Sequence, residues 1–129
     1  MATGTLCRAE RLRGEKLISN LFDNGQSFFQ MPYRVFWIKI DEQGLYPVRF
    51  AVSVPKRRFK GAVKRNLLKR RTREVFRINR QILDKTITVA GHIHLMVIYT
   101  SDSLLPYAEL EDAMKKILHR IAQKYVESV

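Results

Sequence analysis

The sequence has little of three things on which many small proteins depend: cysteine, acidic residues and long apolar runs. Its 129 residues include a single cysteine, Cys7, so no disulfide framework can form and a reducing compartment is the expected setting. No segment has the apolar run of a signal peptide or the length of a membrane span. We therefore expect a cytoplasmic protein.

Acidic residues are outnumbered two to one, with 12 Asp and Glu against 24 Lys and Arg, which gives a net charge of +12. A folded domain with this excess repels itself until a polyanion neutralises it, so we expect nucleic acid or an anionic membrane surface as the partner. The sequence offers no nucleophile–base set and no pair of catalytic carboxylates, and we predict no catalytic residue. His92 and His94 share a strand face, but no cysteine or carboxylate joins them, and we predict no metal site.

Apolar residues make up 46% of the chain, enough for one domain spanning residues 1–129, with residues 1–10 as a flexible N-terminal segment. Periodicity predicts a three-turn helix within residues 11–25, one strand or two short ones over 27–40, a hairpin turn at 41–44, a strand over 47–54, a helix from about 61 to about 84, a strand over 93–100 and a C-terminal helix after Ser103 or Pro106. One sheet with helices on its faces is the simplest architecture.

The stretch "VPKRRFKGAVKRNLLKRRTREVFRINR" combines a dense positive charge with regularly spaced apolar residues. On a helical wheel one arc holds Val63, Leu67, Leu68, Val75, Ile78 and Ile82, and the opposite arc holds Arg65, Asn66, Lys69, Arg70, Arg73, Arg77 and Arg80. A disordered basic tail or a targeting signal does not require apolar residues at helical spacing opposite its charges. The pattern therefore predicts an amphipathic helix with one face for the sheet and one for phosphates.

Three residues of this helix do not fit the simple division into an apolar and a basic arc. Arg71 projects toward the apolar arc, with Glu74 as its expected partner. Asn66 is the uncharged polar residue within the basic arc, and its amide offers both a donor and an acceptor. It could bridge a phosphate, a 2′-hydroxyl or a base edge, or bond to local backbone, and its spacing favours neither alternative.

The segment "AVKRNLLKRRTREVFR" resembles the signature of the protein subunit of bacterial ribonuclease P. The residues that match the family pattern Ala-Val-x-Arg-Asn-x-x-Lys-Arg-x-x-Arg-Glu are Ala62, Val63, Arg65, Asn66, Lys69, Arg70, Arg73 and Glu74. "RLRGEKLISNLFDNG" is similar to the family's first helix, and "RFAVSVPKR" to one of its strand ends. The resemblance extends over nearly the whole chain.

The resemblance implies an α/β two-layer sandwich of order αβββαβα, like the second domain of ribosomal protein S5, with a left-handed βαβ crossover. It also implies a subunit that assists a catalytic RNA in removing the 5′ leader of precursor tRNA. The RNA performs this endonucleolytic hydrolysis with Mg²⁺, and the protein needs no catalytic side chain, bound cofactor or protein partner of its own.

The resemblance and the residue types together predict two groups of binding residues, with Ala51 and Ser53 included for their small side chains on the third strand. The RNA-binding set is Lys56, Arg57, Arg58, Lys60, Lys64, Arg65, Asn66, Lys69, Arg70, Arg73 and Arg77, and the leader-binding cleft is Ile18, Phe22, Phe36, Ala51 and Ser53. Single-strand sites combine aromatic platforms with nearby cations, which this set provides. Without the resemblance, Phe22 and Phe36 would be assigned to the core.

The chain departs from the family pattern at three places. Ile18 stands where the family usually has Phe, Pro55 stands where it has Ser, and the connection "RRFKGAV" is about one residue longer. Two other functions stay open on the residues alone: a ribosomal or general RNA-binding protein, and a nuclease that acts without RNA. The missing carboxylate cluster argues against the nuclease.

Overall fold

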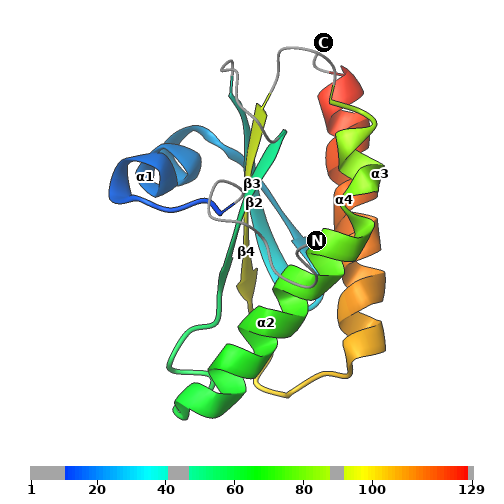
Figure 1. The fold of residues 1–129 in the computed structure, drawn as a ribbon. Coiled ribbons are helices and arrows are strands. Elements are labelled where there is room, and N and C mark those ends of the chain that lie inside the picture. The colour runs from blue at the N-terminus through cyan, green and yellow to red at the C-terminus, as the bar shows by residue number, and fades with distance from the viewer. Residues whose placement is uncertain (1–10, 41–46, 88–91, 128–129) are drawn as a thin grey trace, which may run out of the picture.

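The computed structural model describes residues 11–40, 47–87 and 92–127. Its elements are α1 (Glu15–Asn24), β1 (Gln26–Gln30), β2 (Tyr33–Ile40), β3 (Val48–Ser53), α2 (Ala62–Asn79), α3 (Gln81–Asp84), β4 (His92–Tyr99) and α4 (Tyr107–Glu127). The strands form one sheet, with α1 against one face and the other helices against the opposite face (Figure 1). This is the predicted sandwich. The segment 1–10, with Cys7, lies outside the described residues.

The strand order is β1-β2-β4-β3, with β1, β2 and β4 antiparallel in turn and β3 parallel to β4. The predicted hairpin between the second and third strands is therefore wrong as a pairing, because β4 lies between them. The predicted turn at 41–44 itself lies outside the described residues. β4, whose residues are mostly buried, lies between β2 and β3. The handedness of the β3–α2–β4 crossover stays a prediction.

The hydrophobic core fills the space between the sheet and the helices α2 and α4. Trp37 of β2 and Leu95 of β4 are almost fully buried there, and Phe50 of β3 stacks on Phe76 of α2 with ring centroids 4.2 Å apart. The predicted C-terminal helix packs on this core through one buried stripe, made of Leu110, Ala113, Met114, Ile117, Leu118, Ile121 and Tyr125. No helix in the described part of the chain is long and apolar enough to cross a bilayer.

Helix α1 has the predicted length of about three turns and ends, as expected, at Asn24 before Gly25. It begins only at Glu15, because Gly14 has a φ of 102°, a conformation that glycine adopts most readily. The residues before it pair with the sheet instead: the amide of Leu12 donates to the carbonyl of Phe50 at 2.9 Å. At the other end, a side chain at Gly25 would collide with the backbone of Leu21.

The predicted helix over 61–84 is two helices, because the chain turns at Arg80 between α2 and α3. The amide of Asn79 bonds to the carbonyl of Val75 at 2.8 Å, a side-chain bond that competes with helix continuation. The predicted apolar arc is also partly wrong: Val63 is 83% exposed and Ile78 is 45% exposed. The first turns of α2 extend past the sheet, so the residues buried on this helix are Leu68, Thr72, Val75 and Phe76 (Figure 1).

Candidate nucleic-acid interface

The sheet face opposite the core is only partly covered by α1. The register aligns Phe36, Met96 and Ala51 across three neighbouring strands, and Arg34, Ile98 and Ser53 in the next row. These six residues are named the open sheet face below. All are half-buried except Arg34, which is exposed. Phe36, Met96 and Ile98 make the middle of this face apolar. The side chains on β3 are small, and Arg34 of β2 adds a positive charge.

An aromatic pair stands where α1 meets this face. The rings of Phe22 and Phe36 lie edge to face, with centroids 4.7 Å apart and an interplanar angle of 76°. Phe22 remains 43% exposed and Phe36 is half-buried, so neither belongs to the hydrophobic core. Ile18, one turn before Phe22, is half-buried as well. The structure thus brings all five predicted cleft residues to this face or its rim, with Ser53 in the second row at the end of β3.

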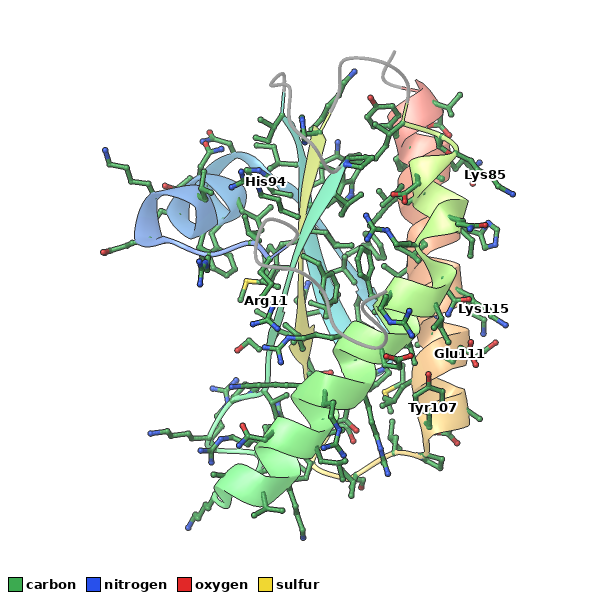
Figure 2. All side chains as sticks on the ribbon, in the orientation of Figure 1. Arg11, Lys85, His94, Tyr107, Glu111 and Lys115 are labelled. Atoms are coloured by element: carbon green, nitrogen blue, oxygen red, sulfur yellow. The ribbon has the colours of Figure 1, made fainter. Side chains whose placement is uncertain are left out.

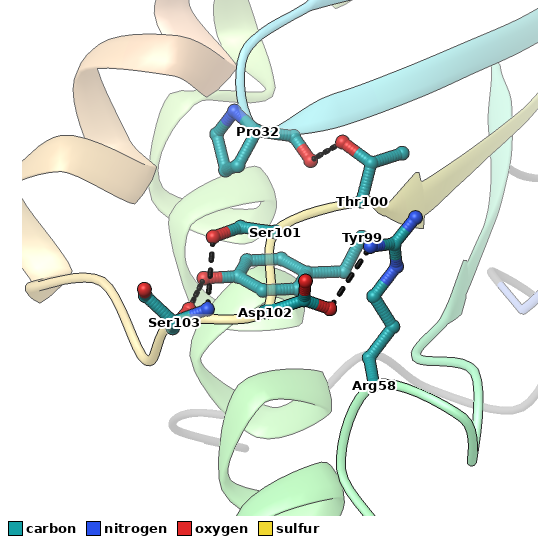
Figure 3. A network of polar contacts seen from close by, with 7 residues as sticks. All are labelled: Pro32, Arg58, Tyr99, Thr100, Ser101, Asp102 and Ser103. Atoms are coloured by element: carbon teal, nitrogen blue, oxygen red, sulfur yellow. Dashed lines mark hydrogen bonds and ion pairs between the residues drawn. The ribbon is translucent and has the colours of Figure 1, made fainter.

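Residues 55–60, named the basic loop, continue directly from the end of β3. The loop is anchored through Phe59, which is 8% exposed and lies 6.0 Å from the ring of Tyr99. Arg58 forms an ion pair with Asp102 at 2.9 Å (Figure 3). These two contacts leave Lys56, Arg57 and Lys60 exposed to solvent.

The turn after β4 supports the basic loop through its own polar contacts (Figure 3). The hydroxyl of Tyr99 donates to the carbonyl of Ser103 at 2.6 Å and accepts from the amide of Leu105 at 3.2 Å. The hydroxyl of Thr100 donates to the carbonyl of Pro32 at 2.8 Å. Burial raises the pKa of the Tyr99 phenol. The turn therefore holds Asp102 where Arg58 reaches it.

The predicted phosphate-facing ridge of α2 is only partly available for a ligand. Arg65 donates from Nη1 to the carbonyls of Phe59 and Lys60, each at 2.8 Å, and so ties the helix to the basic loop. Arg77 is paired with Glu74. The expected pair between Arg71 and Glu74 is therefore wrong, because Arg77 on the following turn holds that carboxylate.

Exposed polar groups remain along the same helix. Lys64, Asn66 and Arg70 are exposed, while Lys69 and Arg73 are half-buried. The Asn66 side chain forms no hydrogen bond with any residue that the structure describes. The local-backbone alternative for Asn66 thus finds no support, and its amide is free to meet a ligand.

Two groups of residues in this region were missed by sequence reasoning. Asp102 could not be identified from the sequence, because a single acidic residue in a loop belongs to no periodicity or motif that would mark it as a partner of Arg58. Arg11 and Arg13 did give one, a short basic pair outside the helix, and with Arg73 they line a pocket of about 230 Å³ at the edge of β3. Among the described residues, no group of three or more His, Cys, Asp or Glu side chains is placed to hold a metal ion.

Together these elements define an α/β sandwich whose two parallel strands are joined through a basic helix, with an open aromatic face beside it. The family model for Ribonuclease P matches residues 6–122, and the chain belongs to the ribonuclease P protein family. The family resemblance drawn from the sequence is thereby confirmed.

Curated relatives and solved structures agree with this family. The Ribonuclease P protein component of Porphyromonas gingivalis is 37% identical over 124 residues, which is 94% of this chain and 89% of the relative. The ribonuclease P protein of Thermotoga maritima has a similar structure, with a TM-score of 0.68 at 22% identity over 86% of this chain and 96% of the other. That of Staphylococcus aureus gives a TM-score of 0.65 at 21% identity, over 89% and 96%. The predicted fold class is confirmed by these structures.

Proposed function

We propose that this chain is the protein subunit of a ribonuclease P holoenzyme, where it binds the catalytic RNA and precursor tRNA and assists removal of the 5′ leader. The observation that carries the proposal is continuity between two surfaces. The open sheet face ends at Ser53, and after one buried residue, Val54, the chain enters the basic loop. A single strand lying on the face would therefore run toward a cluster of cations. Such a protein works in the cytoplasm, with its precursor tRNA.

The leader is the proposed ligand of the open sheet face and of the Phe22–Phe36 pair. Single-stranded RNA binds where bases can stack on aromatic rings and phosphates can meet cations. Phe22 and Phe36 offer the rings, and Arg34 offers a charge on the same face. Ala51 and Ser53 allow close approach of the strand because their side chains are small. Ile18 supplies an apolar contact at the rim.

The catalytic RNA is the proposed ligand of the basic loop and α2. Lys56, Arg57, Lys60, Lys64 and Arg70 are exposed cations that can replace counterions on phosphates. Asn66 lies among them and can bond a phosphate, a 2′-hydroxyl or a base edge. Arg58, Arg65 and Arg77 have contacts within the protein, so part of their role is to shape this surface.

Hydrolysis itself is assigned to the RNA, with Mg²⁺ held by RNA oxygens. Phosphodiester hydrolysis with Mg²⁺ uses clustered oxygen ligands to hold the ion. The described part of the chain has no cluster of metal-binding side chains. In the proposal the protein contributes binding and positioning, and no side chain takes part in the chemical step.

Reconstitution tests this proposal. Purified protein is added to the ribonuclease P RNA of the same genome at low Mg²⁺ and near-physiological salt, and leader removal from precursor tRNA is measured. We expect a clear gain in rate over RNA alone. No gain would favour the alternative of a ribosomal or general RNA-binding protein, and cleavage by the protein after removal of all RNA would favour a protein nuclease.

A further inference from the structure

The edge strand β1 continues the open sheet face by one more strand. In the register of β1 with β2, Ser27 lies beside Phe36 and Phe29 lies beside Arg34. Alternate residues of a strand point to the same face, so Ser27 and Phe29 share the face of Phe36 and Arg34, while Phe28 packs against the hydrophobic core. The second row of the face therefore ends in an aromatic residue at the free edge of the sheet.

Phe29 is accessible at the end of this face that the protein leaves uncovered. On β4, His94 is 2% exposed and lies on the α1 side of the sheet (Figure 2), whereas Ile98 on the same face is only half-buried. In the row of Ile98, Phe29 is 49% exposed. A single exposed aromatic residue is ordinary on a protein surface. Here the residue adjoins the Phe22–Phe36 pair, so three aromatic side chains with accessible surface gather on one face.

The backbone of Phe29 is held from the opposite side of the sheet by α4. Arg120 donates from Nη1 to the carbonyl of Phe29 at 3.1 Å, and its guanidinium lies 4.0 Å from the centroid of the Phe28 ring. Phe28 in turn packs against the core. These contacts use the helix side of β1 and leave the ring of Phe29 on the open side. Because its backbone is already placed, Phe29 loses little freedom when a ligand binds to its ring.

A positive charge lies between the two aromatic positions. Arg34 is exposed, and it forms no ion pair with any residue that the structure describes. Phe36 and Phe29 are diagonal neighbours across β2 and β1, positions that are about 7–8 Å apart in antiparallel sheets. Neighbouring bases of an extended single strand can span this spacing, so that each base meets one ring while a phosphate between them meets Arg34.

We propose that Phe29 is a second base-stacking platform, which takes a base of the 5′ leader next to the base that meets Phe36. The occupant follows from continuity, because Phe29 lies in the row of the open sheet face that runs from Arg34 to Ser53 and on toward the basic loop. Stacking on an aromatic ring tolerates every base, so this platform lengthens the bound segment of the leader without selecting its sequence. The identity of the strand as a leader rests on the function proposed above.

The first test measures equilibrium binding of the reconstituted holoenzyme to precursor tRNA and to mature tRNA. Phe29→Leu keeps an apolar side chain but removes the ring, and it should weaken binding of precursor tRNA about five- to tenfold. Phe29→Tyr keeps the ring and should bind like the wild type. Met31→Ala is the matched control, because Met31 is an apolar residue just beyond β1 that is 55% exposed, and it should leave the affinity unchanged. Equal affinities of Phe29→Leu and the wild type, or an equal loss for mature tRNA, would overturn the platform.

The second test shortens the leader one nucleotide at a time in the same binding measurement. Below a certain leader length Phe29→Leu should no longer weaken binding, and Phe36→Ala should lose its effect at a different length, because each ring takes its own base. Loss of both effects at the same length would mean that the two rings share one base, and the second platform would be refuted.

A third measurement separates this inference from the proposed function. The free protein is titrated with a short, fluorescently labelled oligouridylate at near-physiological salt, which needs no ribonuclease P RNA. Phe29→Leu should weaken this binding and Met31→Ala should not, even if reconstitution gives no gain in leader removal. Conversely, a gain in leader removal, with equal affinities of Phe29→Leu and the wild type for both oligouridylate and precursor tRNA, would retain the function and remove the platform.

Discussion

Phe22 of α1 and Phe36 of β2 lie edge to face, with ring centroids 4.7 Å apart, outside the hydrophobic core. Edge-to-face pairs of this kind are stabilising by about 0.5–1.5 kcal/mol beyond their buried area. Phe22 nevertheless keeps 43% of its surface exposed. A ring that is held in place and still accessible is suited to stacking on a base, since little side-chain freedom is lost on binding.

Phe36→Ala should weaken binding of leader-bearing precursor tRNA by about 1–3 kcal/mol, the usual loss when a stacked base loses its aromatic platform. The measurement is equilibrium binding of the reconstituted holoenzyme to precursor tRNA and to mature tRNA. Val126→Ala is the control, because Val126 is an apolar residue of α4 that is 61% exposed. Equal losses for both RNAs would assign Phe36 a structural role only.

Arg65→Ala should loosen the basic loop, because Nη1 of Arg65 donates to two carbonyls of that loop. We expect faster tryptic cleavage within residues 56–60, together with weaker binding to the catalytic RNA. Arg70→Ala is the matched control: it removes one exposed charge of the same helix, should leave the cleavage rate unchanged and should reduce the salt slope of RNA binding by about one. Identical cleavage rates in the two variants would show that Arg65 does not hold the loop.

The sequence predicted most of the fold because the apolar patterns are local. The strand over 47–54 and the C-terminal helix follow from such patterns, and both are found in the structure, as β3 and α4. Strand order did not follow from the patterns. A turn-like segment between two strands suggests a hairpin, but β4, which is buried along more of its length than either strand, lies between them. Such competition is decided by tertiary packing.

The candidate site could be predicted as a set of residues but not as a geometry. Basic residues at helical spacing located the face of α2, and the family pattern located Phe22 and Phe36. The ion pair of Arg58 with Asp102 joins positions 44 residues apart, and no sequence periodicity reports such a contact. For the same reason Arg65 was expected to face phosphate, although its Nη1 faces the loop. Side-chain partners across elements depend on the packing that brings the elements together.

Tyr33→Phe should lower the free energy of unfolding by about 1–3 kcal/mol, because it leaves a buried hydroxyl of Thr72 without its partner. In the native protein the two hydroxyl oxygens are 2.7 Å apart, and both side chains are fully buried. Thr72→Val should cost a similar amount. The double variant should be more stable than the sum of the two losses implies, as urea unfolding of all four proteins can measure. Simple additivity would mean that the bond contributes little.

The same tyrosine should make the fold sensitive to alkali. Burial raises the pKa of the Tyr33 phenol far above its ordinary value, so the folded protein keeps this proton where the unfolded chain loses it. A raised folded-state pKa gives stability that is complete below the unfolded value, about 10, and is lost as the pH rises above it. The free energy of unfolding should therefore fall by up to about 1.4 kcal/mol per pH unit from this one group. Between pH 9 and 11 the free energy of unfolding of Tyr33→Phe should decline less steeply than that of the wild type, whatever the stability of the variant at neutral pH. Tyr107→Phe is the control, because its phenol is less buried, and it should change the slope of this decline less. Equal slopes in the wild type and Tyr33→Phe would mean that another group governs unfolding in alkali.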